Sequence, residues 1–302
     1  MTMPNFLIIG AMKSGTTSLY HYLKQHPQIY MSPVKEPKFF ALEGEPFYSD
    51  SRGSGGLARI KGIRDIKSYQ EQFEEVSHEI AIGEASPLYI YVPKAVERIK
   101  YYIPEAKLIA ILRHPVDRAY SHFLHWVQRG LEPLDSSFES VIREEEIRIS
   151  QDWSPNWHYK QRGFYYQQLK RYYENFNREQ IKVYLYEDLR KNSIDMTQDI
   201  CRFLGVDDNF VPDTSSQFNV SKVPRNKTIH VLLTKPNPMK NILKPFLPKK
   251  FAQQIKTKLR KQNMVKPELE QEIRMKLIKK YRDDILKLQD LIEKDLSKWL
   301  NC

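Results

Sequence analysis

Short apolar runs alternate along the chain with longer segments in which apolar residues recur at every third or fourth position. Four runs predict buried strands: Asn5–Ile9, Ile80–Ile82, Lys107–Leu112 and Ile181–Tyr186. Six segments have helical periodicity: Thr16–Gln25, Pro93–Tyr102, Val116–Gln128, Ser137–Ile149, Phe164–Phe176 and Met196–Leu204. Because strands that alternate with helices form parallel sheets, the pattern predicts an α/β fold with a central parallel sheet and helices on both faces.

The last part of the chain predicts a long amphipathic helix. From Pro267 to Leu300 the apolar residues fall at helical spacing, and a proline suits the first turn. We expect this helix, at about residues 267–300, to dock on the core. The chain has 302 residues, 41% of them hydrophobic, which is enough to bury one large core. We therefore interpret residues 1–302 as a single domain.

A basic, proline-containing segment at about residues 227–262 interrupts this pattern. Between Lys227 and Lys261 there are ten Lys or Arg residues and no Asp or Glu, in a chain of net charge +11. We interpret the segment mainly as a solvated insertion beside an anion site, and the alternative is a weak contact with an anionic surface. Nucleic acid is a poorer partner because the aromatic residues are too sparse to stack on bases.

Apolar run lengths and cysteine usage predict a cytoplasmic protein. The longest apolar runs have the length of strands rather than of membrane spans, and Phe6–Ile9 is too short for a signal peptide. The two cysteines, Cys201 and Cys302, provide neither a disulfide framework nor the spacing of a metal site.

The first predicted strand leads into a glycine-bounded loop and then a helix, from Gly10 to Leu19. This arrangement is typical of phosphate-binding loops, in which backbone N–H groups and the positive end of the helix dipole meet an anion. The nucleotidase pattern GxxxxGK[ST] places a lysine after the second glycine. Here Thr16 follows Gly15, and the only lysine is Lys13, inside the loop. The loop therefore predicts a phosphate-bearing donor that is not a nucleoside triphosphate.

A second anion site is predicted where the strand Lys107–Leu112 ends. Arg113 leaves the carboxyl end of this strand, and Ser121 lies eight residues later on the following helix. Open α/β sheets bind ligands at the carboxyl ends of their strands, so both side chains can converge on one anion. Arginine binds a phosphate bidentately, and serine adds a neutral donor.

Both segments resemble the nucleotide-binding motifs of sulfotransferases that use 3′-phosphoadenosine 5′-phosphosulfate (PAPS). In that family the loop lysine contacts the oxygen that bridges sulfur and phosphorus, and the pattern R-x-P, with a serine eight residues after the arginine, binds the 3′-phosphate. The resemblance implies that Arg113 and Ser121 hold the 3′-phosphate. It assigns the 5′-phosphosulfate to Lys13, Ser14, Gly15, Thr16 and Thr17.

Further matches suggest the remaining site residues. KEPKFF (Lys35–Phe40) resembles a segment of the heparan-sulfate-modifying branch in which the glutamate, here Glu36, is the proposed general base, although Lys38 replaces a histidine. Tyr186 in LYEDL matches a tyrosine near the adenine. Among the histidines near Arg113, namely His114, His122 and His125, each is an alternative base, and we interpret them as structural or solvated. Lys222 and Arg225 either complete the 3′-phosphate site or are solvated.

One departure concerns the acceptor. Where heparan-type enzymes carry E-K-[TS]-P, this chain has Glu84-Ala85-Ser86-Pro87, so a lysine expected near the acceptor is missing. The aromatic residues Trp157, Tyr159 and Tyr165 either stack on a sugar ring or belong to the core. We therefore expect a small, weakly charged carbohydrate or metabolite as the acceptor.

The resemblance implies a PAPS-dependent sulfotransferase that moves a sulfuryl group in line to a hydroxyl or amine and requires no metal. One alternative is a kinase on the same kind of sheet, for which Glu84 would be the magnesium-binding acid. The other is a membrane-peripheral anion-binding module that uses residues 227–261. The kinase alternative lacks the GK[ST] lysine and would place the cation of Arg113 beside a magnesium ion, and the binding module does not explain Lys13, Arg113 and Ser121 together.

Overall fold

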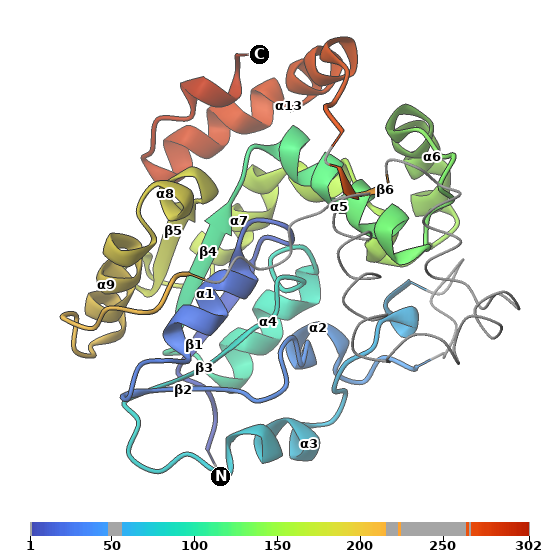
Figure 1. Ribbon diagram of the computed structural model, residues 1–302. Coiled ribbons are helices and arrows are strands. Elements are labelled where there is room, and N and C mark those ends of the chain that lie inside the picture. The colour runs from blue at the N-terminus through green and yellow to red at the C-terminus, as the bar shows by residue number, and fades with distance from the viewer. Residues whose placement is uncertain (1, 48–55, 216–222, 225–263, 266, 302) are drawn as a thin grey trace, which may run out of the picture.

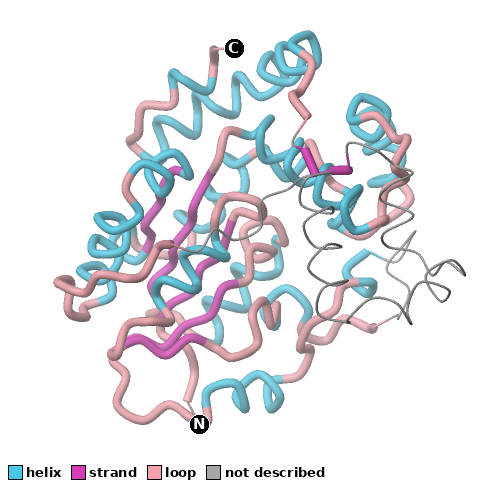
Figure 2. The backbone as a smooth tube through the Cα atoms, in the orientation of Figure 1, coloured by secondary structure: helices cyan, strands magenta, loops and turns pink. Residues whose placement is uncertain are grey.

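The computed structural model describes residues 2–47, 56–215, 223–224, 264–265 and 267–301. Its centre is a five-stranded sheet in the order β2-β3-β1-β4-β5, and every pair of neighbours is parallel (Figures 1 and 2). The strands are β1 (Phe6–Gly10), β2 (Ile29–Met31), β3 (Ala81–Ala85), β4 (Lys107–Leu112) and β5 (Ile181–Leu185). The predicted parallel sheet is confirmed. The three-residue edge strand β2 was not expected.

Strand β1 lies in the middle of the sheet and is buried along its whole length. Its side chains alternate between two cores: Leu7 and Ile9 belong to the larger one, and Phe6 and Ile8 to the smaller one. This burial on both faces explains why the run FLIIG is continuously apolar rather than alternating.

Helices cover both faces of the sheet, as the sequence predicts (Figure 1). The larger core is formed with α4 (Pro93–Tyr102), α5 (Pro115–Arg129), α7 (Tyr165–Tyr173) and α13 (Gln271–Ile292). The smaller core is formed with α1 (Thr16–Leu23) and α9 (Ser193–Leu204). The other helices are α2 (Phe39–Leu42), α3 (Ile66–Gln70), α6 (Phe138–Ser150) and α8 (Tyr186–Lys191), with 3-10 turns at Gly56–Arg59, Glu71–Phe73, Pro155–Trp157, Gln161–Gly163, Arg178–Gln180 and Ser297–Trp299.

Local signals set the ends of the helices near the site. Pro115 occupies the first turn of α5, and the side chain of His114 accepts a hydrogen bond from the N–H of Val116 (3.2 Å). Ser137 caps α6 by accepting from the N–H of Ser140 (3.0 Å). These caps fix the direction in which each helix leaves its loop.

The C-terminal helix is present but shorter than expected. Helix α13 begins at Gln271, four residues after Pro267, and ends at Ile292 rather than at residue 300. It ends there because Glu293 adopts a left-handed conformation (φ 53°) and the side chain of Gln289 accepts the N–H of Leu296 (3.0 Å). A separate 3-10 turn then buries Trp299.

Two short strands flank the basic segment in the sequence. Val223–Pro224 (β6) pairs antiparallel with Met264–Val265 (β7), and β6 lies against α5. The predicted basic insertion itself falls outside the described residues. None of the helices in the described ranges combines the length and the apolar composition needed to cross a membrane.

The contact between β1 and β3 generates a stability prediction. Gly83 is the register partner of Phe6, and a Cβ at Gly83 would overlap the Phe6 ring. We expect Gly83→Ala to lower the free energy of unfolding by about 1–3 kcal/mol, measured by urea denaturation. In the double variant with Phe6→Leu the smaller side chain leaves room, so the two effects are less than additive. Additive effects would contradict this packing.

Candidate active site

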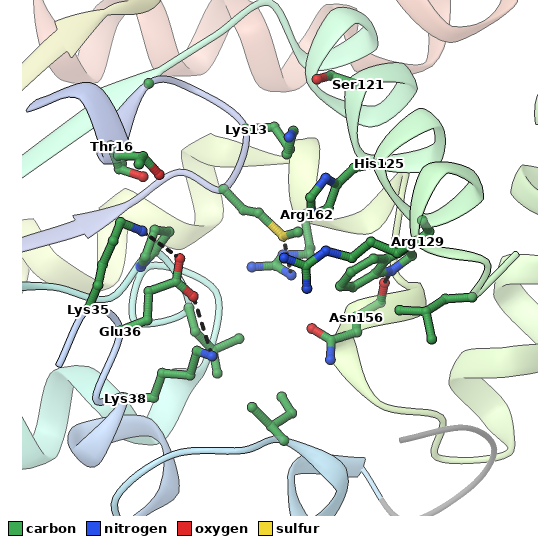
Figure 3. A pocket seen from close by; sticks show the side chains of 18 of the residues that line it. Lys13, Thr16, Lys35, Glu36, Lys38, Ser121, His125, Arg129, Asn156 and Arg162 are labelled. Carbon is green, nitrogen blue, oxygen red and sulfur yellow. Dashed lines mark hydrogen bonds and ion pairs between the residues drawn. The ribbon is translucent and has the colours of Figure 1, made fainter. Parts of the chain in front are cut away.

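A cavity of about 650 Å³ opens at the carboxyl ends of the strands (Figure 3). Its walls come from the loop after β1, the segment around Glu36, helix α5, the turns at Pro155–Trp157 and Gln161–Gly163, and the start of α8. This is the edge at which open α/β sheets bind ligands.

The loop after β1 holds Lys13 in a sparsely populated conformation. Lys13 has φ 68°, and Gly15, which precedes α1, has φ 95°. A Cβ at Gly15 would lie 2.5 Å from Leu189 and 3.2 Å from Tyr186, so only glycine fits between the loop and α8. Non-glycine residues at positive φ cluster at functional sites, where the surrounding structure offsets the strain.

Arg113 joins the ends of β1 and β4. Its Nη1 donates to the carbonyl of Lys13 (3.2 Å), and its guanidinium lies 4.8 Å from the centre of the Tyr186 ring. Ser121, further along α5, is buried and lines the same cavity. The structure therefore brings Arg113, Ser121 and Tyr186 together with the loop, as the sequence predicts.

The loop residues do not all face the cavity. Lys13, Gly15, Thr16 and Thr17 line it, with the two threonines opening α1. Ser14 is fully buried, and its N–H donates to the carbonyl of Ala11 (3.2 Å). Ser14 therefore does not line the cavity, whereas the threonines do, and the contacts of all three with the donor stay predictions.

Lys13 lies in a strongly positive environment. Burial and then the nearby Arg113 and Arg129 lower the pKa of Lys13 from 10.5 to about 8. An anion in the cavity would oppose both effects, because it stabilises the charged ammonium. The loop is thus prepared for a negatively charged ligand.

Glu36 faces the cavity between two lysines. Its carboxylate accepts from the Nζ of Lys35 (3.0 Å) and forms an ion pair with the Nζ of Lys38 (3.3 Å), as Figure 3 shows. Burial would raise the pKa of Glu36, but Lys38 and Lys35 outweigh it and hold the pKa below its usual range. Glu36 and Lys38 both have positive φ (62° and 63°). The carboxyl group of Glu36 is therefore ionised at neutral pH.

Of the three histidines near Arg113, His125 lines the cavity. Burial, with Lys13 and Arg129 next, lowers the pKa of His125 to about 3, so its imidazole is neutral. His122 is fully buried, and its pKa lies well below the ordinary value, mainly through burial. His114 caps α5. His125 alone has the position of an alternative proton acceptor.

Glu84 is enclosed rather than available to a metal. It is fully buried on β3, its Oε1 accepts from the hydroxyl of Tyr69 (3.4 Å), and burial raises its pKa to about 7. It does not line the cavity. In the part of the chain that the structure describes, no three His, Cys, Asp or Glu side chains form a group that could hold a metal ion. The magnesium role that the kinase alternative gives to Glu84 has no geometric support.

Several cavity residues were not anticipated from the sequence. Lys35, Arg129, Asn156 and Arg162 line the cavity, and of these only Lys35 belongs to a motif named above, KEPKFF, where no role is assigned to it. The backbone N–H of Lys38 donates to the Oγ of Ser86 (3.0 Å), next to Ala85, while the ammonium of Lys38 pairs with Glu36 (3.3 Å).

The remaining sequence expectations divide between core, cavity and the parts not described. Trp157 lines the cavity, whereas Tyr159 and Tyr165 are fully buried core residues. Lys222 and Arg225 lie outside the described residues.

The loop between β1 and α1 carries a cation, and an arginine lies at the end of the neighbouring strand β4. This arrangement is typical of α/β proteins that bind phosphorylated ligands. The chain belongs to the sulfotransferase family. The family model described as "Sulfotransferase family" matches residues 4–210.

Similar proteins agree with this assignment. The membrane-associated sulfotransferase kil1 of Dictyostelium discoideum is 38% identical over 149 residues, which are 48% of this chain and 28% of the relative. The human bifunctional heparan sulfate N-deacetylase/N-sulfotransferase 3 is 32% identical over 68% of this chain and 22% of the relative. The chain thus spans about a quarter of the length of these curated relatives. The crystal structure of a sulfotransferase from Alicyclobacillus acidocaldarius is 34% identical, with a TM-score of 0.77 and 100% of both chains covered.

The enclosure of Glu84 predicts a pH dependence of stability. Because its folded pKa, about 7, exceeds the ordinary 4.5, the folded state holds the proton more tightly. The resulting stabilisation is full below pH 4.5 and is lost as the pH rises through about 7, a change on the order of 3 kcal/mol. We expect Glu84→Gln to remove this slope in urea denaturation across that range. A variant that keeps the wild-type slope would show that Glu84 is ionised in the folded protein.

Proposed function

We propose that the protein transfers a sulfuryl group from PAPS to a hydroxyl or amine of a carbohydrate or small molecule. The observation that carries this proposal is the arrangement of Lys13, Arg113 and Glu36 around one cavity, with Arg113 bonded to the Lys13 carbonyl. A loop cation beside one anion site and a carboxylate across from it are the groups this transfer requires.

The charge of the cavity supports an anionic donor. Eight cationic side chains line its described walls, against the single carboxylate of Glu36: Lys13, Lys35, Lys38, Arg59, Lys61, Arg113, Arg129 and Arg162. PAPS brings about four negative charges, from its phosphosulfate and its 3′-phosphate. Arg113 and Ser121 suit the 3′-phosphate, and the ring of Tyr186 offers a surface for the adenine. We keep Lys222 and Arg225 as candidates for the 3′-phosphate because they flank β6, which lies against α5.

Bound PAPS would supply an electrophilic sulfur and a phosphate leaving group. The Lys13 ammonium and the N–H groups of Thr16 and Thr17 then stabilise the charge that develops on the leaving 5′-phosphate oxygen. One preorganised donor of this kind contributes roughly 3–4 kcal/mol. Positioning and charge stabilisation, rather than a protein nucleophile, account for the catalysis.

Glu36 takes the proton of the acceptor. As the acceptor oxygen or nitrogen bonds to sulfur, the S–O bond to the phosphate breaks, the proton moves to the Glu36 carboxylate, and adenosine 3′,5′-bisphosphate leaves. Lys35 and Lys38 keep Glu36 ionised between turnovers. A positioned base contributes about 10²–10⁴-fold. His125 is the second candidate for this role.

The other assignments rest on weaker observations. A carbohydrate acceptor is supported by relatives named for heparan sulfate. We propose one domain over residues 1–302, since the strands β1 to β5 form one sheet. We propose the cytoplasm as the compartment because Cys201 is a buried free thiol, which suits a reducing environment.

Nucleotide binding tests the donor. Adenosine 3′,5′-bisphosphate should raise the melting temperature without metal, because Arg113 and Ser121 meet its 3′-phosphate, and 5′-AMP should do so much less. At 100 times its Kd a ligand adds about 2.7 kcal/mol, which a thermal melt resolves easily. ATP with Mg²⁺ is the control for the kinase alternative. Equal stabilisation by AMP, or a larger effect of ATP with Mg²⁺, would reject the PAPS assignment.

Lys13 should control the alkaline side of the pH profile. With its pKa near 8 in the free protein, the ammonium is lost above that pH, so kcat/KM for the donor should fall there. Bound donor raises this pKa by its negative charge, so the fall in kcat should occur at higher pH. Lys13→Ala should reduce kcat by orders of magnitude, with a smaller loss of nucleotide affinity.

Arg113→Ala is the matched comparison, because it should weaken nucleotide binding first. Lys13→Arg should move the fall in kcat/KM upward, since a guanidinium does not titrate in this range. If Lys13→Ala kept near-normal turnover, or if kcat/KM stayed level to about pH 10, Lys13 would not stabilise the leaving group.

A further inference from the structure

Arg162 is a buried arginine without an acidic partner. Its side chain is only 4% exposed, yet it lines the cavity. Its Nη1 donates to the Sδ of Met12 (3.3 Å) and the carbonyl of Pro155 (3.4 Å), and the guanidinium lies 5.3 Å from the centre of the Tyr91 ring. No carboxylate in the described ranges forms an ion pair with it. Burial and then the neighbouring Arg118 lower the pKa of Arg162 to about 10.

Two other helices fix the turn that carries Arg162. The buried carboxylate of Glu145 in α6 accepts from the N–H groups of Lys160 (2.5 Å) and Gln161 (2.7 Å). The hydroxyl of Tyr281 in α13 donates to the carbonyl of Lys160 (2.8 Å). The guanidinium is therefore held in place before any ligand arrives, which reduces the entropy lost on binding.

The position of Arg162 places it across the cavity from Glu36, the proposed base. In Figure 3, Arg162 lies between Lys13 and Asn156 and beside Arg129, and its contact with the Sδ of Met12 brings it next to the loop after β1. A molecule that presents its hydroxyl or amine to Glu36 therefore extends toward Arg162.

A buried charge without a counterion is destabilising, and an anion that pairs with it recovers much of that free energy. We assign the donor's charges to Lys13 and Arg113, which leaves the charge of Arg162 for the acceptor. We propose that the acceptor carries a carboxylate or another anionic group, and that Arg162 binds this group next to the sulfated position. This inference rests on the proposed function and replaces the expectation of a weakly charged acceptor.

The binding test uses the full chain saturated with adenosine 3′,5′-bisphosphate. Glucuronate and acetate are titrated against glucose at constant ionic strength, with melting temperature as the readout. At least one carboxylate should raise the melting temperature while glucose does not. Arg162→Gln should weaken the binding of that carboxylate at least about tenfold, which is the contribution of a charge-assisted hydrogen bond. The rise in melting temperature caused by the nucleotide should stay unchanged. Arg143→Gln, which removes the same charge from an exposed face of α6, should change neither.

Further variants keep the result independent of folding. Arg162→Lys should retain part of the carboxylate effect, and Arg162→Met should leave the melting temperature of the free protein unchanged or higher, since an unpaired buried charge is removed. A strong destabilisation by Arg162→Met would instead make Arg162 a structural residue. With labelled PAPS, 4-nitrophenyl glucuronide should be sulfated about tenfold better than the matching glucoside, and Arg162→Gln should abolish the difference.

Three outcomes would overturn the inference: neither carboxylate acts on the nucleotide complex, their effect survives Arg162→Gln, or the glucoside equals the glucuronide as an acceptor. An effect lost in Lys13→Ala but kept in Arg162→Gln would place the anion at the sulfuryl position and equally reject it. If the nucleotide itself gave no stabilisation, the proposed function would fail. A nucleotide effect without a carboxylate effect would reject only the role of Arg162.

Discussion

The site depends on the hydrogen bond from Arg113 to the carbonyl of Lys13, because it joins the ends of two adjacent central strands. Lys13 adopts a left-handed conformation that an isolated loop populates rarely. The guanidinium of Arg113 fixes the Lys13 carbonyl and also packs on Tyr186, at the end of β5. Three neighbouring strand ends are thereby held together, and the position of the Lys13 ammonium follows from that contact.

Repulsion between cations is the second constraint on this site. Arg113 and Arg129 help to lower the pKa of Lys13, and Arg118 does the same to Arg162. Such groups destabilise the free protein, and bound anions relieve the repulsion. The folded protein is therefore less stable than it would be with apolar residues at these positions, as is common at functional sites. Glu36 opposes this repulsion, since its carboxylate acts to raise the pKa of Lys13 and Arg162, but it does not outweigh the burial and the cations that lower them.

The sequence predicted the parts whose signals are local. The order strand, loop and helix identified Lys13, and Pro115 after Arg113 marked both the start of α5 and the second anion site. It could not predict that Glu84 is enclosed beside Tyr69, or that α13 ends at Glu293, because both depend on tertiary packing. The strand β2 was missed because three residues give no periodicity.

Arg162 was not predicted as a cavity residue for a related reason: its position depends on contacts with other helices. The side that we assign to the donor is built by short segments at the ends of β1 and β4, so its chemistry is encoded locally. The turn that carries Arg162 is positioned by Glu145 in α6 and Tyr281 in α13. Tyr281 lies more than a hundred residues from Arg162 in the sequence, so no local pattern reveals the contact. Changes in those helices would therefore act first on Arg162, and would reach the loop after β1 through its contact with Met12.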